Sequence, residues 1–391
     1  MIPASPSEYV LNDMTWPEDW PTYDCAETAA NHVGCNAAGA DLTDLMDDNG
    51  NYTVFDDVWV DYHGSVTVDG VAQWGTVKRG PLTTGFGANG VTHIGPELGF
   101  GVELAKTYGG NRPLVVSLPL TYPCFLRRFS PTAPRPPPIS FLLHSCSLNL
   151  LPSTPQLIKV AWGGTSLAGD WRPPSSGNVT GWCWTNFTEY AHAALANLST
   201  VYPAYDASLG HELGGIVWHQ GWNDGCDTDD AFAYEENLKN FVRDLRTEFQ
   251  DDAPELKVSI PIQGTAGGFR GTVNRRLEIM RAQYNVSTYA ENQGLVSSQE
   301  TRGFYRNYTE SAGACNQGYH WNCNAESYFY VGTVAAQGML GLIDGTWVQP
   351  FINTTVEKLT DYEDEDDLCP INSKNKDQES TFGYVHLPVV V

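Results

Sequence analysis

The sequence predicts an α/β protein in which helices cover both faces of a mostly parallel sheet, a three-layer α/β/α sandwich. Short apolar runs that end in glycine or polar residues alternate along the chain with longer segments whose apolar residues recur every three or four positions. The short runs show no apolar and polar alternation, as expected of strands buried on both faces. Alternating strands and helices favour crossover connections, and hence parallel strands.

The first helix is predicted over 96–108, because proline stands at its first position and Gly109 follows its last. The first apolar run, 157–162, leads into paired glycines and is a candidate strand. A helix over 187–201 separates it from the next strand, 215–219. Ligands of such folds bind at the carboxyl ends of the strands, so the residues after each strand are the first candidates for a site.

The clearest helix is predicted over 230–249, where apolar residues recur at helical spacing and charged residues occupy the other face. Strand 257–261 follows it. Two further helices, 272–291 and 325–342, flank the strand 294–298. Strands and helices therefore alternate through this part of the chain, as a parallel sheet requires.

One domain is expected over 1–345, interrupted by a Pro-rich insertion at about 117–156 and followed by an acidic tail over 346–391. No acidic residue occurs between Glu103 and Asp170, where the chain-wide frequency predicts about eight. Our hypothesis is a translated intron, and the alternative is a genuine surface insertion. A transcript that lacks these codons would support the first. The acidic tail is interpreted as solvated, with calcium binding as the alternative.

The composition excludes some classes of partner. There are 22 Lys and Arg against 46 Asp and Glu, which gives a net charge of 22 − 46 = −24. Nucleic-acid binding needs clustered cations that neutralise phosphates, so no nucleic-acid partner is expected. No apolar run reaches the roughly 20 residues of a membrane-spanning helix, so no membrane insertion is expected.

Seven Asn-x-Ser/Thr sites predict an extracellular protein or one of the secretory pathway, although no signal peptide follows Met1. The nine cysteines are odd in number and include no CxxC pair, so they do not decide disulfide pairing. His320 and Cys323 have only Cys315 nearby as a third ligand, so no metal site is expected.

Three polar segments that contain glycine carry the candidate chemistry. They are 161–167 (Ala-Trp-Gly-Gly-Thr-Ser-Leu), 217–225 (Val-Trp-His-Gln-Gly-Trp-Asn-Asp-Gly) and 318–326 (Gly-Tyr-His-Trp-Asn-Cys-Asn-Ala-Glu). The paired glycines let backbone N–H groups approach a ligand oxygen. Four tryptophans in and near the first two segments suggest a wall on which a sugar stacks, with core packing as the alternative; they are Trp162, Trp171, Trp218 and Trp222.

With these segments and 94–101 (Ile-Gly-Pro-Glu-Leu-Gly-Phe-Gly), the chain from about 56 to 341 resembles the sialate O-acetylesterase-like carbohydrate esterases of the SGNH hydrolase superfamily. The resemblance implies a flavodoxin-like α/β/α fold. It also implies a serine hydrolase that removes acetyl groups from sugars without a cofactor. The partner is then an acetylated carbohydrate.

The resemblance implies three catalytic residues. Asn223 of the Gly-Trp-Asn-Asp block donates its side-chain N–H to the oxyanion, Gly164 donates its backbone N–H, and His320 is the general base. Such donors stabilise the charge that develops on the carbonyl oxygen. Gln317 stands where the family often has an acid that orients the histidine, and Glu300 is the proposed substitute. Substrate binding is assigned to Gln220, Arg172 and Trp222, with a surface ion pair as the alternative for Arg172.

The nucleophile is not identified. The family's early Gly-Asp-Ser block, with the strand before it, is absent and is expected upstream of Met1. Ser65, in an irregular polar stretch, and Ser166, in the glycine block, are weak internal candidates. The chain as written is therefore either an incomplete esterase or a non-catalytic carbohydrate-binding module derived from the esterase fold. Asn223 could also merely cap the following turn, and the glycines could serve only a tight turn.

Overall fold

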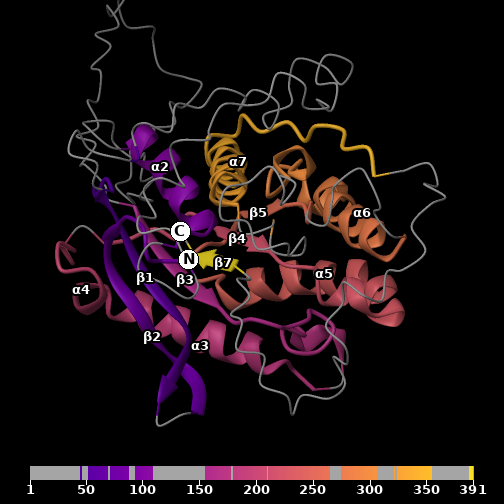
Figure 1. Ribbon diagram of the computed structural model, residues 1–391, viewed down its shortest axis with the longest axis horizontal. Coiled ribbons are helices and arrows are strands. Elements are labelled where there is room, and N and C mark those ends of the chain that lie inside the picture. Colours follow the sequence, from indigo (N-terminus) through magenta and orange to yellow (C-terminus); the bar gives the residue numbers. More distant parts are fainter. Residues whose placement is uncertain are drawn as a thin grey trace, which may run out of the picture.

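The computed structural model describes residues 45, 52–68, 71–87, 93–108, 155–177, 179–208, 210–264, 274–305, 321, 324–354 and 387–390. Within these residues the strands form one sheet in the order β2-β1-β3-β7-β4-β5-β6. Figure 1 shows the sheet running through the middle of the molecule, with helices above and below it. The predicted α/β class with a mostly parallel sheet is confirmed.

The strands are β1 (Phe55–Val68), β2 (Val71–Leu82), β3 (Gln156–Ala161), β4 (Ile216–His219), β5 (Val258–Pro261), β6 (Val296–Gln299) and β7 (Leu387–Val390). Three neighbouring pairs are parallel: β1 with β3, β4 with β5, and β5 with β6. The two strands that run antiparallel to their neighbours are β2 and β7. The four predicted strands match β3 to β6 within one or two residues at each end.

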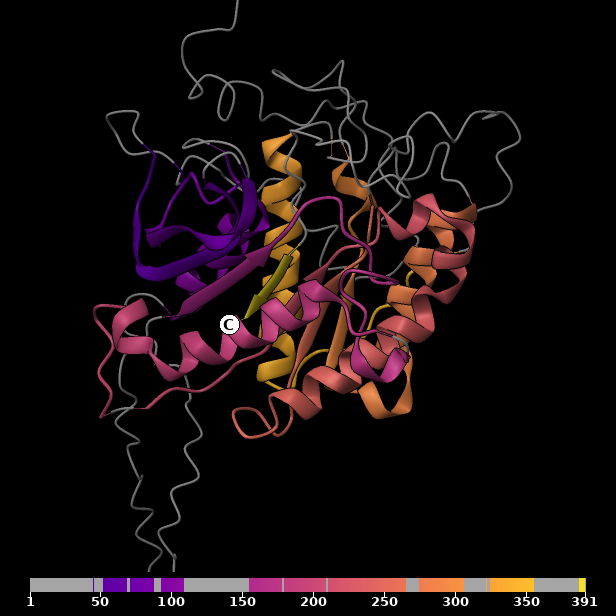
Figure 2. The ribbon, with the colours of Figure 1, turned by 90° about the horizontal axis from the view of Figure 1, so that it is seen from below.

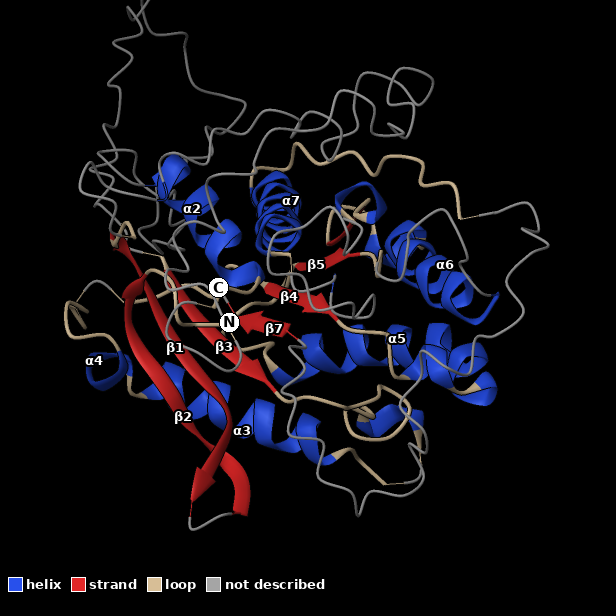
Figure 3. Ribbon diagram, in the orientation of Figure 1, coloured by secondary structure: helices blue, strands red, loops and turns tan. Residues whose placement is uncertain are grey.

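The helices are α2 (Pro96–Tyr108), α3 (Trp182–Ala196), α4 (Leu198–Val201), α5 (Thr228–Glu248), α6 (Asn274–Thr288) and α7 (Ala325–Ile343), as coloured in Figure 3. The segment predicted as one helix over 187–201 is two helices. The break falls at Asn197, whose backbone φ of −129° is not helical. α3 also begins five residues earlier than predicted, directly after Gly181. Apolar periodicity predicts that a helix is present, but it does not locate the residues at which the backbone leaves the helical conformation.

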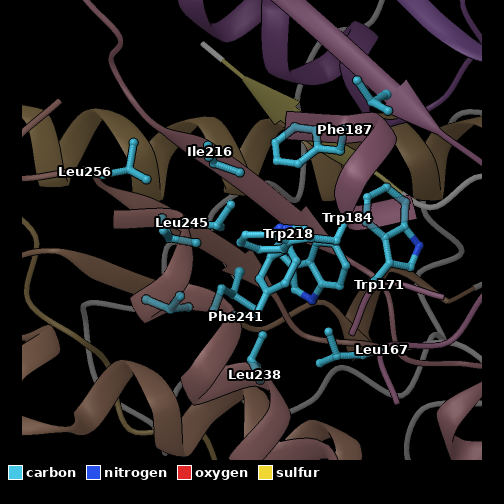
Figure 4. Packing of buried hydrophobic residues seen from close by; sticks show 14 of the residues in the cluster. Leu167, Trp171, Trp184, Phe187, Ile216, Trp218, Leu238, Phe241, Leu245 and Leu256 are labelled. Carbon is cyan, nitrogen blue, oxygen red and sulfur yellow. The ribbon is translucent and has the colours of Figure 1, made fainter. Parts of the chain in front are cut away.

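The side chains of β3 alternate between the two faces of the sheet. Ile158 and Val160 belong to a core with α3 and α5, whereas Leu157 and Ala161 belong to a core with α2 and α7. Figure 2, viewed from below, accordingly shows α3 in front of the sheet and α7 behind it. Figure 4 shows the first core, in which the rings of Trp171 and Trp218 lie 5.5 Å apart. Both faces of β3 are buried, as expected of a strand that shows no apolar and polar alternation.

β1 and β2 form a hairpin that the sequence pattern did not reveal. Ser65, expected in an irregular stretch, lies in β1 and is paired with Trp74 of β2. β1 pairs with β3 only as far as Gly64, which is opposite Ala161, the last residue of β3. The distal part of the hairpin therefore extends past the carboxyl end of β3, the edge at which the glycine block begins.

Two parts of the predicted tail 346–391 lie within the folded unit. The side-chain oxygen of Gln349 accepts a hydrogen bond from the Ser298 backbone N–H at 2.8 Å, and Ile352 is buried beside α6. Further on, β7 lies between β3 and β4. The run 361–367, on which the calcium alternative depends, and the insertion 117–156 lie outside the described residues.

The segment 94–101 holds α2 against β3 and α7. The side chain of Glu97 is buried and accepts a hydrogen bond from Lys159 Nζ of β3 at 2.9 Å, and a second from the Gly95 backbone N–H at 2.8 Å. A Cβ at Gly99 would overlap the Phe329 carbonyl oxygen of α7. Glycine therefore lets α2 and α7 approach closely.

Among the described helices, none has the length and apolar character to cross a bilayer.

Candidate active site

The glycine block begins where β3 ends. Thr165 shapes this turn, since its hydroxyl donates to the Trp162 carbonyl at 3.0 Å and accepts from Trp171 Nε1 at 2.9 Å. Gly164 has a φ of +66° and is exposed. A side chain would strain this left-handed backbone, so the tight turn needs glycine here. The same turn leaves the Gly164 backbone at the solvent-facing edge of the sheet.

The second block begins where β4 ends. Gly221 has a φ of +145°, and a Cβ there would lie 2.5 Å from a methyl carbon of Ile279. Asn223 precedes a short 3-10 helix, η4 (Asp224–Cys226), and its side chain makes no capping hydrogen bond. Its buried Oδ1 has no hydrogen-bond partner among the described residues. The alternative in which Asn223 only caps the turn is therefore not supported.

The carboxylate of Asp224 joins the two blocks. It accepts hydrogen bonds from the backbone N–H groups of Leu167 and Ala168, both at 2.9 Å, and from Gln220 Nε2 at 2.6 Å. Asp224 is fully buried, and burial raises its pKa to about 7 although the three N–H donors act in the opposite direction. The structure thus holds the Gly164 loop directly against the turn that carries Asn223.

Gln220 belongs to the framework beneath this junction and differs from its predicted role in substrate binding. Its Nε2 also donates to the Thr165 carbonyl at 3.1 Å, and its Oε1 accepts from the Tyr234 hydroxyl at 3.1 Å. Gln283 Nε2 donates to the Gln220 carbonyl at 2.6 Å. With only 1% of its surface exposed, the side chain of Gln220 is satisfied inside the protein.

Trp222 and Arg172 also differ from the predicted substrate contacts. Trp222 is 2% exposed, and the guanidinium of Arg276 covers its ring at 3.6 Å. Arg172 donates to the carbonyls of Ala168, Gly177 and Ser176 at 3.0, 2.9 and 2.6 Å. Arg172 therefore shapes its own loop, and the ring of Trp222 is buried beneath Arg276.

Glu300 lies directly after β6. Its two carboxylate oxygens accept from Arg302 Nε at 2.9 Å and from Arg302 Nη2 at 2.6 Å, and both side chains are buried. His320 lies outside the described residues, so its meeting with Asn223, Gly164 and Glu300 stays a prediction. Trp321, the next residue, is described: it is buried, has an unusual φ of +53°, and its ring lies 6.4 Å from that of His219.

The serine candidates occupy different surroundings. Ser65 is exposed on the hairpin, whereas the Ser166 hydroxyl accepts from the Gly169 backbone N–H at 3.2 Å within the glycine block. Neither observation identifies a nucleophile. Within the described part of the chain, no three His, Cys, Asp or Glu side chains gather at metal-binding spacing.

Sequence reasoning missed the polar framework of Asp224, Tyr234 and Gln283. Asp224 was visible as part of the Gly-Trp-Asn-Asp block, but its partners at 167 and 168 lie more than fifty positions away. Tyr234 and Gln283 sit on helices whose apolar periodicity gives no reason to single them out. Their common feature is a buried polar atom that needs a partner, which only the structure shows.

His219 gives a prediction for acid stability. It is buried, its Nδ1–H donates to the Pro261 carbonyl at 3.1 Å, and burial lowers its pKa to about 4. The unfolded value is about 6.5, so the fold favours the neutral ring. This preference for the neutral ring contributes about 3 kcal/mol to the unfolding free energy above about pH 6.5. The contribution is lost as the pH falls to 4.

We therefore expect the unfolding free energy of His219→Gln to fall less than that of the wild type between pH 7 and pH 4.5, as measured by urea titration. The surface variant His192→Gln should keep the wild-type slope. Equal slopes in all three proteins would show that His219 is charged in the folded state.

Residues 152–306 match the model of the family described as carbohydrate esterase, sialic acid-specific acetylesterase. This segment is similar to that esterase family. The match contains the glycine block, the Asn223 turn and the Asp224 contacts that join them, and the resemblance drawn from the motifs is confirmed there.

One solved structure is also similar to part of the chain. The X-ray structure of a protein from Arabidopsis thaliana, at 1.6 Å resolution, matches 49% of this chain and 63% of its own chain, with 16% identity and a TM-score of 0.34. The chain thus spans less than two thirds of that protein's length. Comparison with curated proteins gives no match.

Proposed function

We propose that the protein is a carbohydrate O-acetylesterase-type serine hydrolase that removes acetyl groups from sugars. The observation that carries this proposal is the junction made by Asp224, which holds the Gly164 loop against the Asn223 turn at the carboxyl ends of β3 and β4. The match of residues 152–306 to a carbohydrate esterase family supports the same reaction class. The substrate is an acetylated carbohydrate.

In the proposed mechanism a serine attacks the ester carbonyl while His320 takes its proton, and His320 returns that proton to the sugar oxygen as its bond to the acetyl carbon breaks. Water, deprotonated by His320, then attacks the acetyl-serine and releases acetate and the free serine. The negative charge on the carbonyl oxygen is stabilised by the Asn223 side-chain N–H and the Gly164 backbone N–H. Trp321, adjacent to His320 in the sequence, packs beside His219 at the end of β4, which supports a role for His320 at this edge. No cofactor is needed.

The nucleophile is proposed to follow a parallel strand between β3 and β4, where a flavodoxin-like three-layer fold has its first strand. β7 holds that position in antiparallel orientation. The connections β1-α2-β3 and β3-α3-β4 both cross the sheet in the same direction, from β2 toward β6. Their helices, α2 and α3, cover opposite faces of the sheet, so the two crossovers have opposite handedness. Parallel crossovers are almost always right-handed, and a central strand preceding α2 would give both the same hand.

We also propose that the protein enters the secretory pathway. Two of the predicted glycosylation sites, Asn197 and Asn353, are exposed. Cys226, at the end of η4, is disulfide-bonded, and disulfides persist mainly in oxidising compartments. Mobility of the secreted protein on a gel before and after glycosidase treatment tests this, and an unchanged mobility would count against it.

Asn223→Ala tests the proposed function. We expect kcat for deacetylation of a peracetylated methyl glycoside to fall by about 10²–10³, with KM nearly unchanged, because the amide acts on the transition state. Hydrolysis is measured with the chain as written and with its coding sequence extended upstream. Asn197→Ala, on the surface, is the control and should retain wild-type activity.

An active enzyme that is indifferent to Asn223→Ala would overturn the proposed mechanism. If neither form hydrolyses the glycoside and both still bind it, the protein is the non-catalytic carbohydrate-binding module instead.

A further inference from the structure

Three tryptophans from separate elements meet beside the candidate active site. Trp74 comes from β2, Trp162 follows β3, and Trp182 begins α3. The ring centres lie 4.7 Å apart for Trp74 and Trp162, 4.9 Å for Trp162 and Trp182, and 5.7 Å for Trp74 and Trp182. We call this group the tryptophan wall.

The tryptophan wall is attached to the glycine block. Trp162 directly precedes Gly163, so the wall begins where the candidate oxyanion site begins. Trp182 Nε1 donates to Asp170 Oδ1 at 2.7 Å, and Asp170 Oδ2 accepts from the Ser166 backbone N–H at 3.0 Å. The wall and the block are therefore parts of one hydrogen-bonded unit.

Exposure separates this wall from the other tryptophans of the motifs. Trp171, Trp218 and Trp222 are at most 2% exposed and belong to the interior. Trp182 is 38% exposed, while Trp74 and Trp162 are partly exposed. Of the four tryptophans that the sequence suggested for sugar stacking, only Trp162 offers a surface. Clustered aromatic surface beside a site is typical of ligand contact rather than of an ordinary exterior.

The charges behind the tryptophan wall are paired. Asp61 is buried and accepts from Arg79 Nε at 2.6 Å and from the Tyr190 hydroxyl at 2.7 Å. The ring of His63 stacks on Tyr190 at 3.7 Å and on Trp74 at 5.5 Å, and burial lowers its pKa to about 4, so it is neutral near pH 7. The wall therefore has no net charge of its own with which to hold an ionic ligand.

Two arginines that could have received a carboxylate near the site are already engaged. The Arg172 guanidinium donates to carbonyls of its own loop, and that of Arg302 is buried in its pair with Glu300. The chain as a whole carries a charge of −24, which repels anionic glycans. A ligand suited to this surface is uncharged and has an apolar face as wide as an indole.

We propose that the tryptophan wall is a subsite for the pyranose ring of a neutral carbohydrate, and that it selects neutral acetylated glycans over sialate-type ones. The C–H face of a pyranose stacks on the indoles while its hydroxyls stay in water. This inference rests on the proposed function, because it places the sugar beside the ester that Gly164 and Asn223 receive.

The test measures binding, without turnover, by isothermal titration. The probes are neutral hexasaccharides of glucose, xylose or mannose, and a trimer of N-acetylneuraminic acid. We expect at least one neutral probe to bind, and the sialic acid trimer to bind at least about tenfold more weakly. Trp182→Ala and Trp74→Ala should each weaken the neutral probe about tenfold, the effect of losing one stacked ring.

Trp347→Ala is the matched control, since Trp347 is a partly exposed tryptophan just after α7 that makes no contact with the wall. Its affinity for the neutral probe should equal that of the wild type. Trp182 also holds Asp170, so thermal unfolding of each variant is measured, and Trp74→Ala separates stacking from support of the glycine block. A wild-type melting temperature with weakened binding supports the subsite.

The proposal is overturned if no neutral probe binds, or if binding is indifferent to both wall variants. It is also overturned if the sialic acid trimer binds best and Arg276→Gln abolishes this binding, because Arg276 beside Trp222 would then be the anion receptor. Failure of the proposed function gives another pattern: wall-dependent binding persists while Asn223→Ala leaves hydrolysis unchanged.

Discussion

Asp224→Ala is expected to lower the unfolding free energy by about 4 kcal/mol and to abolish the proposed ester hydrolysis. The substitution leaves the N–H groups of Leu167, Ala168 and Gln220 buried without their acceptor, and each such loss costs about 1 to 3 kcal/mol. Because the same carboxylate holds the two blocks together, both proposed oxyanion donors lose their relative position.

Urea unfolding and 4-nitrophenyl acetate hydrolysis measure the two effects of Asp224→Ala. Asp229→Ala is the control, since Asp229 is exposed at the start of α5 and its loss should stay within about 0.5 kcal/mol. A change below 1 kcal/mol at position 224, with activity retained, would mean that the two blocks are held by other contacts.

Lys159→Met is expected to cost about 4 kcal/mol of unfolding free energy. Lys159 and Glu97 are fully buried and form an ion pair at 2.9 Å, and Lys159 also donates to the Phe86 carbonyl. Burial lowers the pKa of Lys159, while Glu97 acts in the opposite direction. Removing one member of a buried pair leaves the other charge uncompensated, which costs about 3 to 5 kcal/mol.

The double variant Lys159→Met/Glu97→Gln should recover a large part of this loss, because no charge is then left in the core. Lys106→Met is the control: Lys106 is largely exposed and its ion pair with Glu103 spans 3.7 Å, so the change should stay below about 1 kcal/mol. Urea unfolding of the wild type, Lys159→Met, Glu97→Gln and the double variant completes the cycle. A double variant as unstable as Lys159→Met would show that the cost lies in lost packing.

The predictable parts of the fold are those with unbroken patterns. β3, β4 and β5 are buried on both faces, so their mostly apolar runs stand out, and α5 buries one regular face. The β1 and β2 hairpin was missed because β2 is exposed along most of its length and β1 mixes acidic with apolar residues. β7 was missed since a four-residue strand containing proline has no distinctive pattern.

The candidate site was predictable in its position and less so in its details. Parallel strands bring their carboxyl ends to one edge, so motifs that follow β3 and β4 are neighbours whatever lies between them. The direction of a side chain does not follow from its type. Gln220, Arg172 and Trp222 have the right chemistry for a sugar site, yet they turn toward buried carbonyls, a carboxylate and an arginine.

The central claim is that Gly164 and Asn223 converge on one oxyanion site. Titration of ¹⁵N-labelled protein with methylphosphonate, a tetrahedral anion of suitable size, tests it most directly by NMR. We predict that the Gly164 backbone N–H and the Asn223 side-chain amide shift together along one saturation curve, and that Asn223→Ala weakens the response at Gly164. Independent curves for the two groups, or a Gly164 response that is unchanged in the variant, would contradict the account.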